Sequence, residues 1–285
     1  MKFNTKCVHG SGRPDSTGAI SPAIYMSSTF SHPKLGDTTG YQYTRESNPT
    51  RDRLEQLIAG LEDGKDALAF SSGMAAVDAV FHLFSPGDHI ILGDDLYGGS
   101  IRMFTNIYEQ NGIEFTYVGT SDLDAVKAAF RPNTKAVYIE TPTNPMMEIT
   151  DIRALCALAH EHNALVIIDN TFLSPYFQKP LNLGADIVVH SGTKFIGGHH
   201  DVISGFTIVN DDELAAKLRL TYKTVGACLY AMDSWLVIRG VKTLALRMEQ
   251  HQKNAIALAE WLKKQPKVTK VLFPGLPEHP GYEIN

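Results

Sequence analysis

Short apolar runs separated by helix-like segments constrain the fold of this chain more than any other feature of its sequence. Six such runs lie in the middle of the chain, at residues 67–70, 89–92, 114–118, 136–140, 164–168 and 186–190. Runs of this length that alternate with helical patterns are typical of a mostly parallel sheet with helices on both faces. The sequence therefore predicts an α/β fold.

Polar segments follow four of these runs, at the predicted strand ends. They are residues 93–97, 141–145, 169–171 and 191–194. In parallel sheets, ligands bind outside the carboxyl ends of the strands, which share one edge. We therefore expect these four segments to converge on one site.

Lys194 and Asp169 suggest the chemistry of that site. Lys194 ends the segment Ser-Gly-Thr-Lys, and Asp169 follows the apolar run 164–168. Each has an ordinary alternative role, as a surface lysine and as a loop-capping carboxylate. Together, a lysine that can form a Schiff base and a carboxylate that can hold a protonated ring nitrogen predict a site for pyridoxal 5'-phosphate (PLP).

Residues 71–76, Ser-Ser-Gly-Met-Ala-Ala, follow the first run and open a helical pattern. Free N–H groups at a helix start, beside a glycine, can bind a phosphate, although the same residues are equally consistent with a helix cap alone. The hydroxyl groups of Ser191 and Thr193 favour the phosphate interpretation. The sequence has no GxxxxGK[ST] or GxGxxG motif, so neither a nucleoside triphosphate nor a dinucleotide is favoured.

Composition argues against several classes of protein. With 285 residues, 44% of them hydrophobic and 20% charged, the chain can bury a large core. A net charge of −5 without a long basic run argues against a nucleic-acid partner. Cys7, Cys156 and Cys228 form no CxxC pair, and no run approaches the length that a membrane helix needs. We expect a cytoplasmic protein with reduced thiols.

The ordered set of motifs resembles the Cys/Met-metabolism (transsulfuration) family of PLP-dependent enzymes. The matching segments are residues 41–50, 71–76, 97–99, 140–145, 169–171 and 191–194. The resemblance implies PLP-dependent transferase fold type I, the aminotransferase-like α/β fold with a mostly parallel sheet flanked by helices. It also implies an extended N-terminal arm at residues 1–58, a large PLP-binding domain at 59–245, and a linking helix with the start of a smaller C-terminal domain at 246–285.

The resemblance assigns roles to residues in these motifs. Lys194 is expected to form the Schiff base and shuttle protons, Tyr97 to stack on the ring and help position the lysine, and Asp169 to hold the ring nitrogen. The other expected cofactor contacts are the backbone N–H groups of Gly73 and Met74 and the side chains of Asn144, Thr171, Ser191 and Thr193. Tyr43 and Arg45 are expected to reach the phosphate bound by a neighbouring subunit, which implies a homotetramer with shared active sites.

The family acts on small sulfur amino acids, and we expect a cystathionine lyase that breaks a C–S bond through a Schiff base and a Cα carbanion. Arg102 matches an arginine that contacts a distal substrate carboxylate in cystathionine-handling members, or is an ordinary exposed arginine. Gly99 stands where methionine γ-lyases carry a cysteine, which counts against that member. The alternatives are γ-replacement, by a cystathionine γ-synthase or a homoserine-ester sulfhydrylase, and a fragment that binds PLP or a partner subunit without turnover.

The sequence departs from the family pattern in three places. Gly192 replaces the usual alanine or cysteine, and residues 198–201 read Gly-His-His-Asp where Gly-His-Ser-Asp is more common. We expect no metal at this second segment, because adjacent side chains point apart. Tyr230 and Ala231 replace a proline-containing loop, which we expect to alter the substrate entrance. Relatives continue past the point that matches residue 285 and bind the substrate α-carboxylate there, so we expect the chain to be incomplete.

Overall fold

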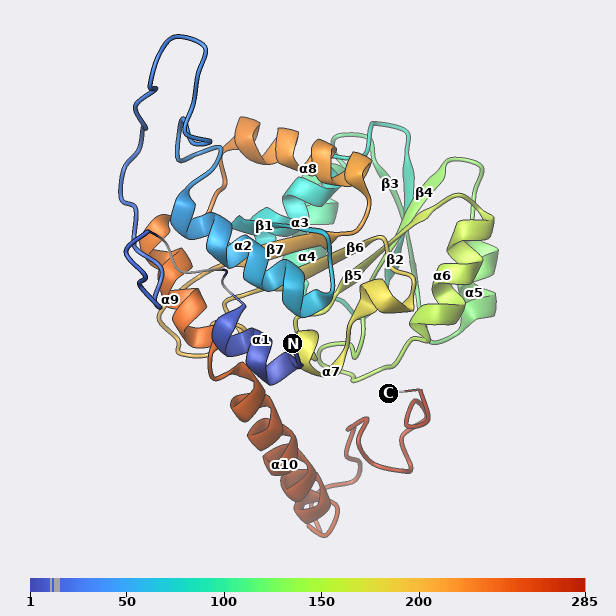
Figure 1. Ribbon diagram of the computed structural model, residues 1–285. Coiled ribbons are helices and arrows are strands. Elements are labelled where there is room, and N and C mark those ends of the chain that lie inside the picture. The colour runs from blue at the N-terminus through green and yellow to red at the C-terminus, as the bar shows by residue number, and fades with distance from the viewer. Residues whose placement is uncertain (11, 13–15, 285) are drawn as a thin grey trace.

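One seven-stranded sheet organises the chain, in the order β1-β7-β6-β5-β4-β2-β3 (Figure 1). The computed structural model describes residues 1–10, 12 and 16–284, so Asn285, the last residue of the predicted C-terminal region, lies outside the described residues. The strands are β1 (Asp66–Phe70), β2 (His89–Gly93), β3 (Glu114–Val118), β4 (Thr134–Glu140), β5 (Leu165–Asp169), β6 (Ile187–Ser191) and β7 (Gly205–Val209). Six of them coincide with the six apolar runs, which confirms the predicted α/β fold.

The remaining strand, β7, was not predicted from the sequence. It pairs antiparallel with both β1 and β6, while the other neighbouring pairs are parallel. Phe70 at the end of β1 and Ser191 at the end of β6 both pair with Gly205, the first residue of β7. The carboxyl ends of β1 and β6 therefore lie on either side of the start of β7, at the edge that the other parallel strands share.

Helices cover both faces of this sheet (Figure 1). They are α1 (Phe3–His9), α2 (Pro49–Glu62), α3 (Gly73–Phe81), α4 (Gly98–Met103), α5 (Leu123–Ala129), α6 (Ile152–Glu161), α7 (Ser174–Phe177), α8 (Asp212–Val225), α9 (Ala231–Val241) and α10 (Leu244–Leu262), with a π-helical turn at Phe104–Tyr108 and a 3-10 turn at Pro180–Leu183. α3, α4 and α8 pack on one face, and α2, α5, α6 and α9 pack on the other. Within the described residues, no helix is both long enough and apolar enough to cross a membrane.

The strands fit between these helix layers because they are apolar on both sides. Every residue of β2 and of β7 is buried, as expected for strands that are covered on both faces. On the α3 face, the ring of Phe104 lies 4.3 Å from that of Phe81 and 5.5 Å from that of Tyr138, measured between centroids. Such aromatic packing fixes the distance between the helices and the sheet.

Helix α2 has clear signals at both ends. Asn48 precedes it and accepts a hydrogen bond of 2.9 Å from the N–H of Thr50, and Pro49 is its first residue. The helix ends before Asp63, which adopts a left-handed conformation with φ of 55°. Its last residue, Glu62, is therefore held at a defined position against the sheet.

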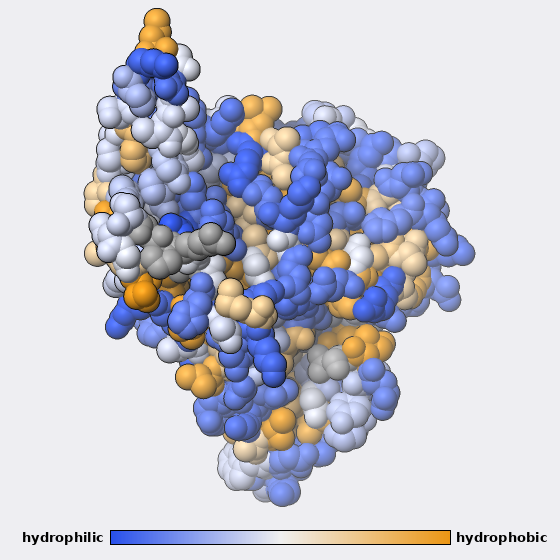
Figure 2. All heavy atoms as spheres, viewed as in Figure 1, coloured by the Kyte–Doolittle hydropathy of each residue, from blue (hydrophilic) through white to orange (hydrophobic). Residues whose placement is uncertain are grey.

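The N-terminal arm before α2 is mostly irregular and projects from the body of the molecule (Figures 1 and 2). Thr29 and Tyr43 form an isolated antiparallel bridge within it, and Leu35 is fully exposed. The predicted domain boundaries at residues 58 and 245 fall inside α2 and α10. The division into arm, large domain and C-terminal region stays a prediction.

Gly205 gives a test of the packing at the strand ends. A Cβ atom at this position would overlap the carbonyl oxygen of Ser72 and lie 2.7 Å from Cα of Gly73. We expect Gly205→Ala to lower the free energy of unfolding by about 1–3 kcal/mol, because the start of α3 must shift. Thermal denaturation should show the loss, whereas Gly60→Ala, at an open position in α2, should leave the Tm unchanged or slightly higher. Equal Tm values for the two variants would contradict this packing.

Candidate active site

One cavity of about 1040 Å³ opens at the carboxyl edge of the sheet. Nine of the predicted site residues line it: Gly73, Met74, Tyr97, Asn144, Asp169, Thr171, Ser191, Thr193 and Lys194. They lie at the ends of β5 and β6 or in segments that follow β1, β2, β4, β5 and β6. The predicted convergence on one edge therefore occurs, while the role of each residue stays a prediction.

Three predicted site residues lie outside the lining of this cavity. Arg45 donates a hydrogen bond to the carbonyl of Lys223, and its guanidinium lies 5.3 Å from the ring centroid of Tyr43. Arg102 is an exposed residue in the last turn of α4. Within this single chain, the structure does not bring Tyr43, Arg45 or Arg102 to the cavity.

The start of α3 forms one wall of the cavity. Ser72 caps the helix by accepting a hydrogen bond of 3.0 Å from the N–H of Ala75. The N–H groups of Gly73 and Met74 have no acceptor among the described residues, as is usual for the first turn of a helix. A Cβ atom on Gly73 would lie 2.8 Å from Cβ of Ser191, so only glycine lets the helix start approach β6 this closely. Free N–H groups next to a serine hydroxyl suit an anion such as a phosphate.

Lys194 lies in a tight loop that leaves its amine free. The N–H of Gly198 donates to the carbonyl of Lys194 at 2.8 Å, and the N–H of Gly197 to that of Gly192 at the same distance. The side-chain nitrogen of Lys194 has no hydrogen bond or ion pair with any residue that the structure describes. A Cβ atom on Gly192 would overlap the ring of Phe206. This contact explains the glycine at a position where the family pattern has a larger residue.

Asp169 lies in the same cavity and is held by two neighbours. Its Oδ1 accepts a hydrogen bond of 3.0 Å from the N–H of Thr171, and the hydroxyl of Tyr138 lies 3.5 Å from its Oδ2. Burial raises the pKa of Asp169, and the hydrogen bonds from Thr171 and the nearby His190 oppose this rise. The carboxylate is therefore in an environment that favours a positively charged partner.

Glu140 is a cavity residue that was not among the predicted site residues. Its Oε2 accepts a hydrogen bond of 3.0 Å from the N–H of Tyr97, the residue that precedes α4. Burial, together with the charge of Asp169, raises the pKa of Glu140 to about 8. Its signal in the sequence was a carboxylate at the end of a buried strand, directly before the Thr-Pro-Thr-Asn-Pro segment. By holding this N–H, Glu140 fixes the point at which Tyr97 enters the cavity.

Tyr97 is half exposed and bends back over its own chain. A Cβ atom on Gly99 would overlap the ring of Tyr97, so the glycine makes room for this orientation. An aromatic ring that is anchored at its backbone and open to the cavity can stack on a flat ligand.

The features of the cavity fit PLP. The free N–H groups of Gly73 and Met74 fit a phosphate, and the free amine of Lys194 fits an aldehyde. Burial raises the pKa values of Asp169 and Glu140, and the charge of Asp169 adds to the rise at Glu140. A protonated ring nitrogen would supply the missing positive charge.

Two residues of α10, Arg247 and His251, also line the cavity, although no motif predicted them. Arg247 donates a hydrogen bond of 2.6 Å to the carbonyl of Phe195 and one of 3.1 Å to that of Gly240. It therefore ties α10 to the loop that follows Lys194. Across the described residues, no group of three or more His, Cys, Asp and Glu side chains is arranged to hold a metal ion.

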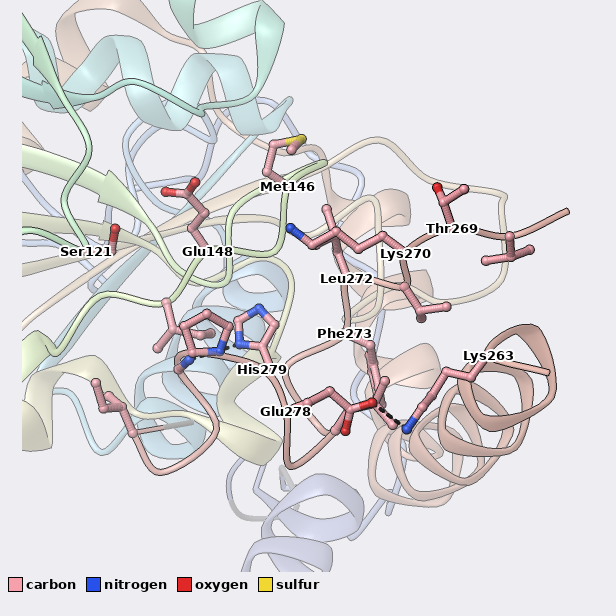
Figure 3. Close-up of a pocket in the computed structure, with 17 residues that line it drawn as sticks. Ser121, Met146, Glu148, Lys263, Thr269, Lys270, Leu272, Phe273, Glu278 and His279 are labelled. Atoms are coloured by element: carbon pink, nitrogen blue, oxygen red, sulfur yellow. Dashed lines mark hydrogen bonds and ion pairs between the residues drawn. The ribbon is translucent and has the colours of Figure 1, made fainter. Parts of the chain in front are cut away.

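A second cavity, of about 590 Å³, lies where residues 268–284 fold back towards the loop after β4 (Figure 3). Met146 and Glu148 line one side, and Lys263 and Glu278 form an ion pair on the other. It shares no lining residue with the first cavity. Since Lys194 and Asp169 both line the first cavity, the PLP-compatible groups are gathered there.

Comparison with known proteins identifies the family of this chain. The family model "Cys/Met metabolism PLP-dependent enzyme" matches residues 4–285. A cystathionine beta-lyase of Lactococcus lactis subsp. cremoris is 50% identical over 283 residues, which are 99% of this chain and 74% of the relative. A cystathionine gamma-lyase of Bacillus subtilis is 49% identical over 285 residues, which are 100% of this chain and 75% of the relative. Relatives named cystathionine gamma-synthase match as well.

Solved structures show the same fold. The crystal structure of cystathionine gamma-lyase from Lactobacillus plantarum complexed with L-serine superposes with a TM-score of 0.98 at 50% identity, covering 100% of this chain and 74% of that one. The predicted PLP-dependent fold and the predicted family are thus confirmed. This chain belongs to the family of Cys/Met metabolism PLP-dependent enzymes.

Proposed function

We propose that this protein is a PLP-dependent cystathionine lyase, which eliminates a thiol from the amino-acid thioether cystathionine. The observation that carries the proposal is the free amine of Lys194 in the same cavity as the buried carboxylate of Asp169. The names of the relatives, cystathionine beta-lyase and cystathionine gamma-lyase, support the substrate.

Each residue of the cavity would have a separate role in such an elimination. Bound PLP supplies an aldehyde and an electron-withdrawing ring. Lys194 would offer the amine for that aldehyde and a base for the Cα proton of the substrate. Asp169 would hold the positive charge of the ring nitrogen, and the start of α3 would hold the phosphate. Tyr97, whose N–H donates to Glu140, would cover the ring and keep Lys194 in position.

The carbon that loses the thiol is defined by the products. Elimination at Cβ, with water, converts cystathionine into homocysteine, pyruvate and ammonia, whereas elimination at Cγ gives cysteine, 2-oxobutyrate and ammonia. Relatives with each activity in their names are 50% and 49% identical to this chain, so identity favours neither. The second candidate is γ-replacement, which relatives named cystathionine gamma-synthase support at 47% identity.

We also propose that two chains share each active site, within a homotetramer. Arg45 and Tyr43 lie together on the projecting arm, and Tyr43 is 41% exposed. The arm also exposes apolar side chains, among them Met26 and Leu35. A projecting apolar arm that carries a cation suits docking on a second copy, where Arg45 would meet the phosphate.

We place the enzyme in the cytoplasm, where small amino acids are metabolised. Cys7, Cys156 and Cys228 are free thiols. Burial raises the pKa of Cys7 to about 11 and that of Cys156 to about 12, so these thiols stay protonated and unreactive. Free thiols in the core suit a reducing compartment. Disulfide-linked protein isolated directly from cells would contradict this placement.

Substitution of Lys194 tests the proposed function. Purified protein with PLP should convert L-cystathionine into one of the two product sets, and Lys194→Ala should lower this rate by at least about 10³-fold, because amine and base are lost together. Borohydride reduction should attach PLP to the parent chain but not to the variant, as read by mass spectrometry. Persistent turnover by a correctly folded variant would refute the role of Lys194. If cystathionine with PLP gave no product but a homoserine ester with cysteine gave cystathionine, γ-replacement would be the function.

The raised pKa of Glu140 predicts a pH dependence of stability. Because the pKa rises from 4.5 to about 8 on folding, the folded state binds more protons than the unfolded state between these values. PLP-free protein should therefore lose stability as pH rises from about 5 to 8. Glu140→Gln should remove part of this loss, of the order of a few kcal/mol. Denaturant titrations at several pH values would measure it, with Glu148→Gln, at an exposed carboxylate, as the control. An unchanged slope in Glu140→Gln would show that Glu140 does not bear the proton.

Mixed subunits test the shared site. Arg45→Ala and Lys194→Ala should each be inactive alone. After mixing in equal amounts and reassembly, the mixture should regain up to about a quarter of the parental activity, because about half of the dimers are hybrids and one of the two sites in each hybrid has both parental residues. Mixtures that stay inactive despite verified subunit exchange would show that Arg45 and Lys194 do not meet across an interface.

A further inference from the structure

A buried polar cluster lies behind the cavity, on the reverse face of β4, β5 and β6. Its members are Glu62 from the end of α2, Asn170 after β5, Gln178 after α7, and His190 in β6. Glu62, Asn170 and His190 are completely buried. No group of this cluster lines the cavity.

Glu62 lies at the centre of the cluster. Its Oε1 lies 2.6 Å from Nε2 of His190 and accepts a hydrogen bond of 2.8 Å from Nδ2 of Asn170. Gln178 donates from Nε2 to Oδ1 of Asn170 and to the carbonyl of Thr141, both at 3.0 Å. Through these contacts, Glu62 connects to the residues that end β4, β5 and β6.

The cluster residues are direct chain neighbours of the cofactor residues. Asn170 follows Asp169, and His190 precedes Ser191. Because successive side chains in a strand point to opposite faces, Asp169 and Ser191 point into the cavity while Asn170 and His190 point to α2. A movement of Glu62 would therefore move Asn170 and His190, and with them the ends of β5 and β6. Asp169 and Ser191 would then shift relative to each other in the cofactor site.

The cluster also has an electrostatic consequence. An ionised carboxylate without contact to water requires a compensating charge. Oε2 of Glu62 and Nδ1 of His190 have no hydrogen-bond partner among the described residues, so the contact between Oε1 of Glu62 and Nε2 of His190 is the one that can provide this charge. A positive charge on His190 would lie close to Asp169. Burial raises the pKa of Asp169, and the charge of His190 opposes that rise.

We propose that Glu62 and His190 form a positioning pair for the cofactor site, which holds the ends of β5 and β6 and places a positive charge behind Asp169. This proposal rests on the proposed function, since Asp169 must hold the PLP ring nitrogen for the pair to act on it. The titratable groups that face Asp169 are His190 on β6 and Tyr138 and Glu140 on β4. Lys194, Arg247 and His251 also line the cavity that Asp169 faces, whereas His190 is the basic side chain behind it.

Glu62→Gln separates charge from shape, because glutamine keeps the size of the side chain and an acceptor oxygen. The variant removes the buried acid that contacts His190, so a positive charge behind Asp169 loses its partner and the carboxylate form of Asp169 is less favoured. We expect PLP to bind about tenfold more weakly at neutral pH. We call the acid limb the part of the pH profile in which PLP affinity falls as pH falls. In titrations from pH 5 to 9, this limb should move to higher pH by about one unit. Absorbance and fluorescence titrations with PLP itself measure both without turnover.

His190→Gln is the second variant, because its amide can still donate to Glu62 while the cationic state is lost. It should shift the acid limb in the same direction. Glu55→Gln is the matched control, since Glu55 is another buried carboxylate of α2 that accepts a hydrogen bond of 3.0 Å from the N–H of Ala69 on β1. The control should lower the Tm without moving the acid limb of PLP affinity.

The outcomes separate this proposal from the proposed function. If parental protein does not bind PLP through Lys194, both fail. If the parent binds PLP and either folded variant keeps the parental acid limb, the pair has only a structural role and the positioning proposal is overturned. The proposal would also be overturned if the acid limb of Glu55→Gln moved as far as that of Glu62→Gln. The shift would then follow from the loss of any buried carboxylate of α2.

Discussion

The register between β5 and β6 is the constraint on which the site depends. Asp169 pairs with Val189, and the N–H of Asn170 donates to the carbonyl of Val189 at 2.9 Å. This register directs Asp169 and Ser191 to the same face, where the N–H of Ser191 donates to the hydroxyl of Thr171 at 2.7 Å. A slip of one residue would turn Asp169 towards α2 and bring Asn170 into the cavity. The pairing of β5 with β6 thus determines which side chains face the cavity.

Much of this arrangement could be predicted because its signals are local. Six of the seven strands are apolar runs of four or five residues, and the polar segments behind them lie at one edge by the rules of parallel sheets. β7 has strand-like residues at Thr207, Ile208 and Val209, but its antiparallel position between β1 and β6 is a long-range pairing that no local pattern specifies. The roles of Glu62 and Arg247 were hidden for the same reason. Their partners, such as His190 for Glu62, are distant in the sequence and meet only in the folded chain.

Electrostatics link the cofactor to the stability of the fold. Burying Asp169 and Glu140 together is unfavourable while both are ionised, and raised pKa values are the consequence. The cationic ring nitrogen that we propose to bind at Asp169 would reverse this, because the buried anion would then have its partner. The unfavourable burial of negative charge therefore lies at the place where the proposed ligand would compensate it. Perturbed pKa values of this kind are common at functional sites. Asp63, by contrast, is already satisfied by Lys6 and Lys179, whose hydrogen bonds outweigh its partial burial and lower its pKa to about 2.

Helix α2 connects the arm to the site of its own chain. Near its start, the buried Arg51 donates to the carbonyl of Thr44 at 2.7 Å and to that of Leu229 at 3.2 Å. Thr44 lies between Tyr43 and Arg45, so this bond fixes the part of the arm that we propose to enter a neighbouring site. At the other end of the same helix, Glu62 binds the reverse side of β5 and β6. One helix therefore links the part of the arm that we propose to enter a neighbouring site with the strand ends of its own site, and it does so through a buried arginine and a buried glutamate that line neither cavity.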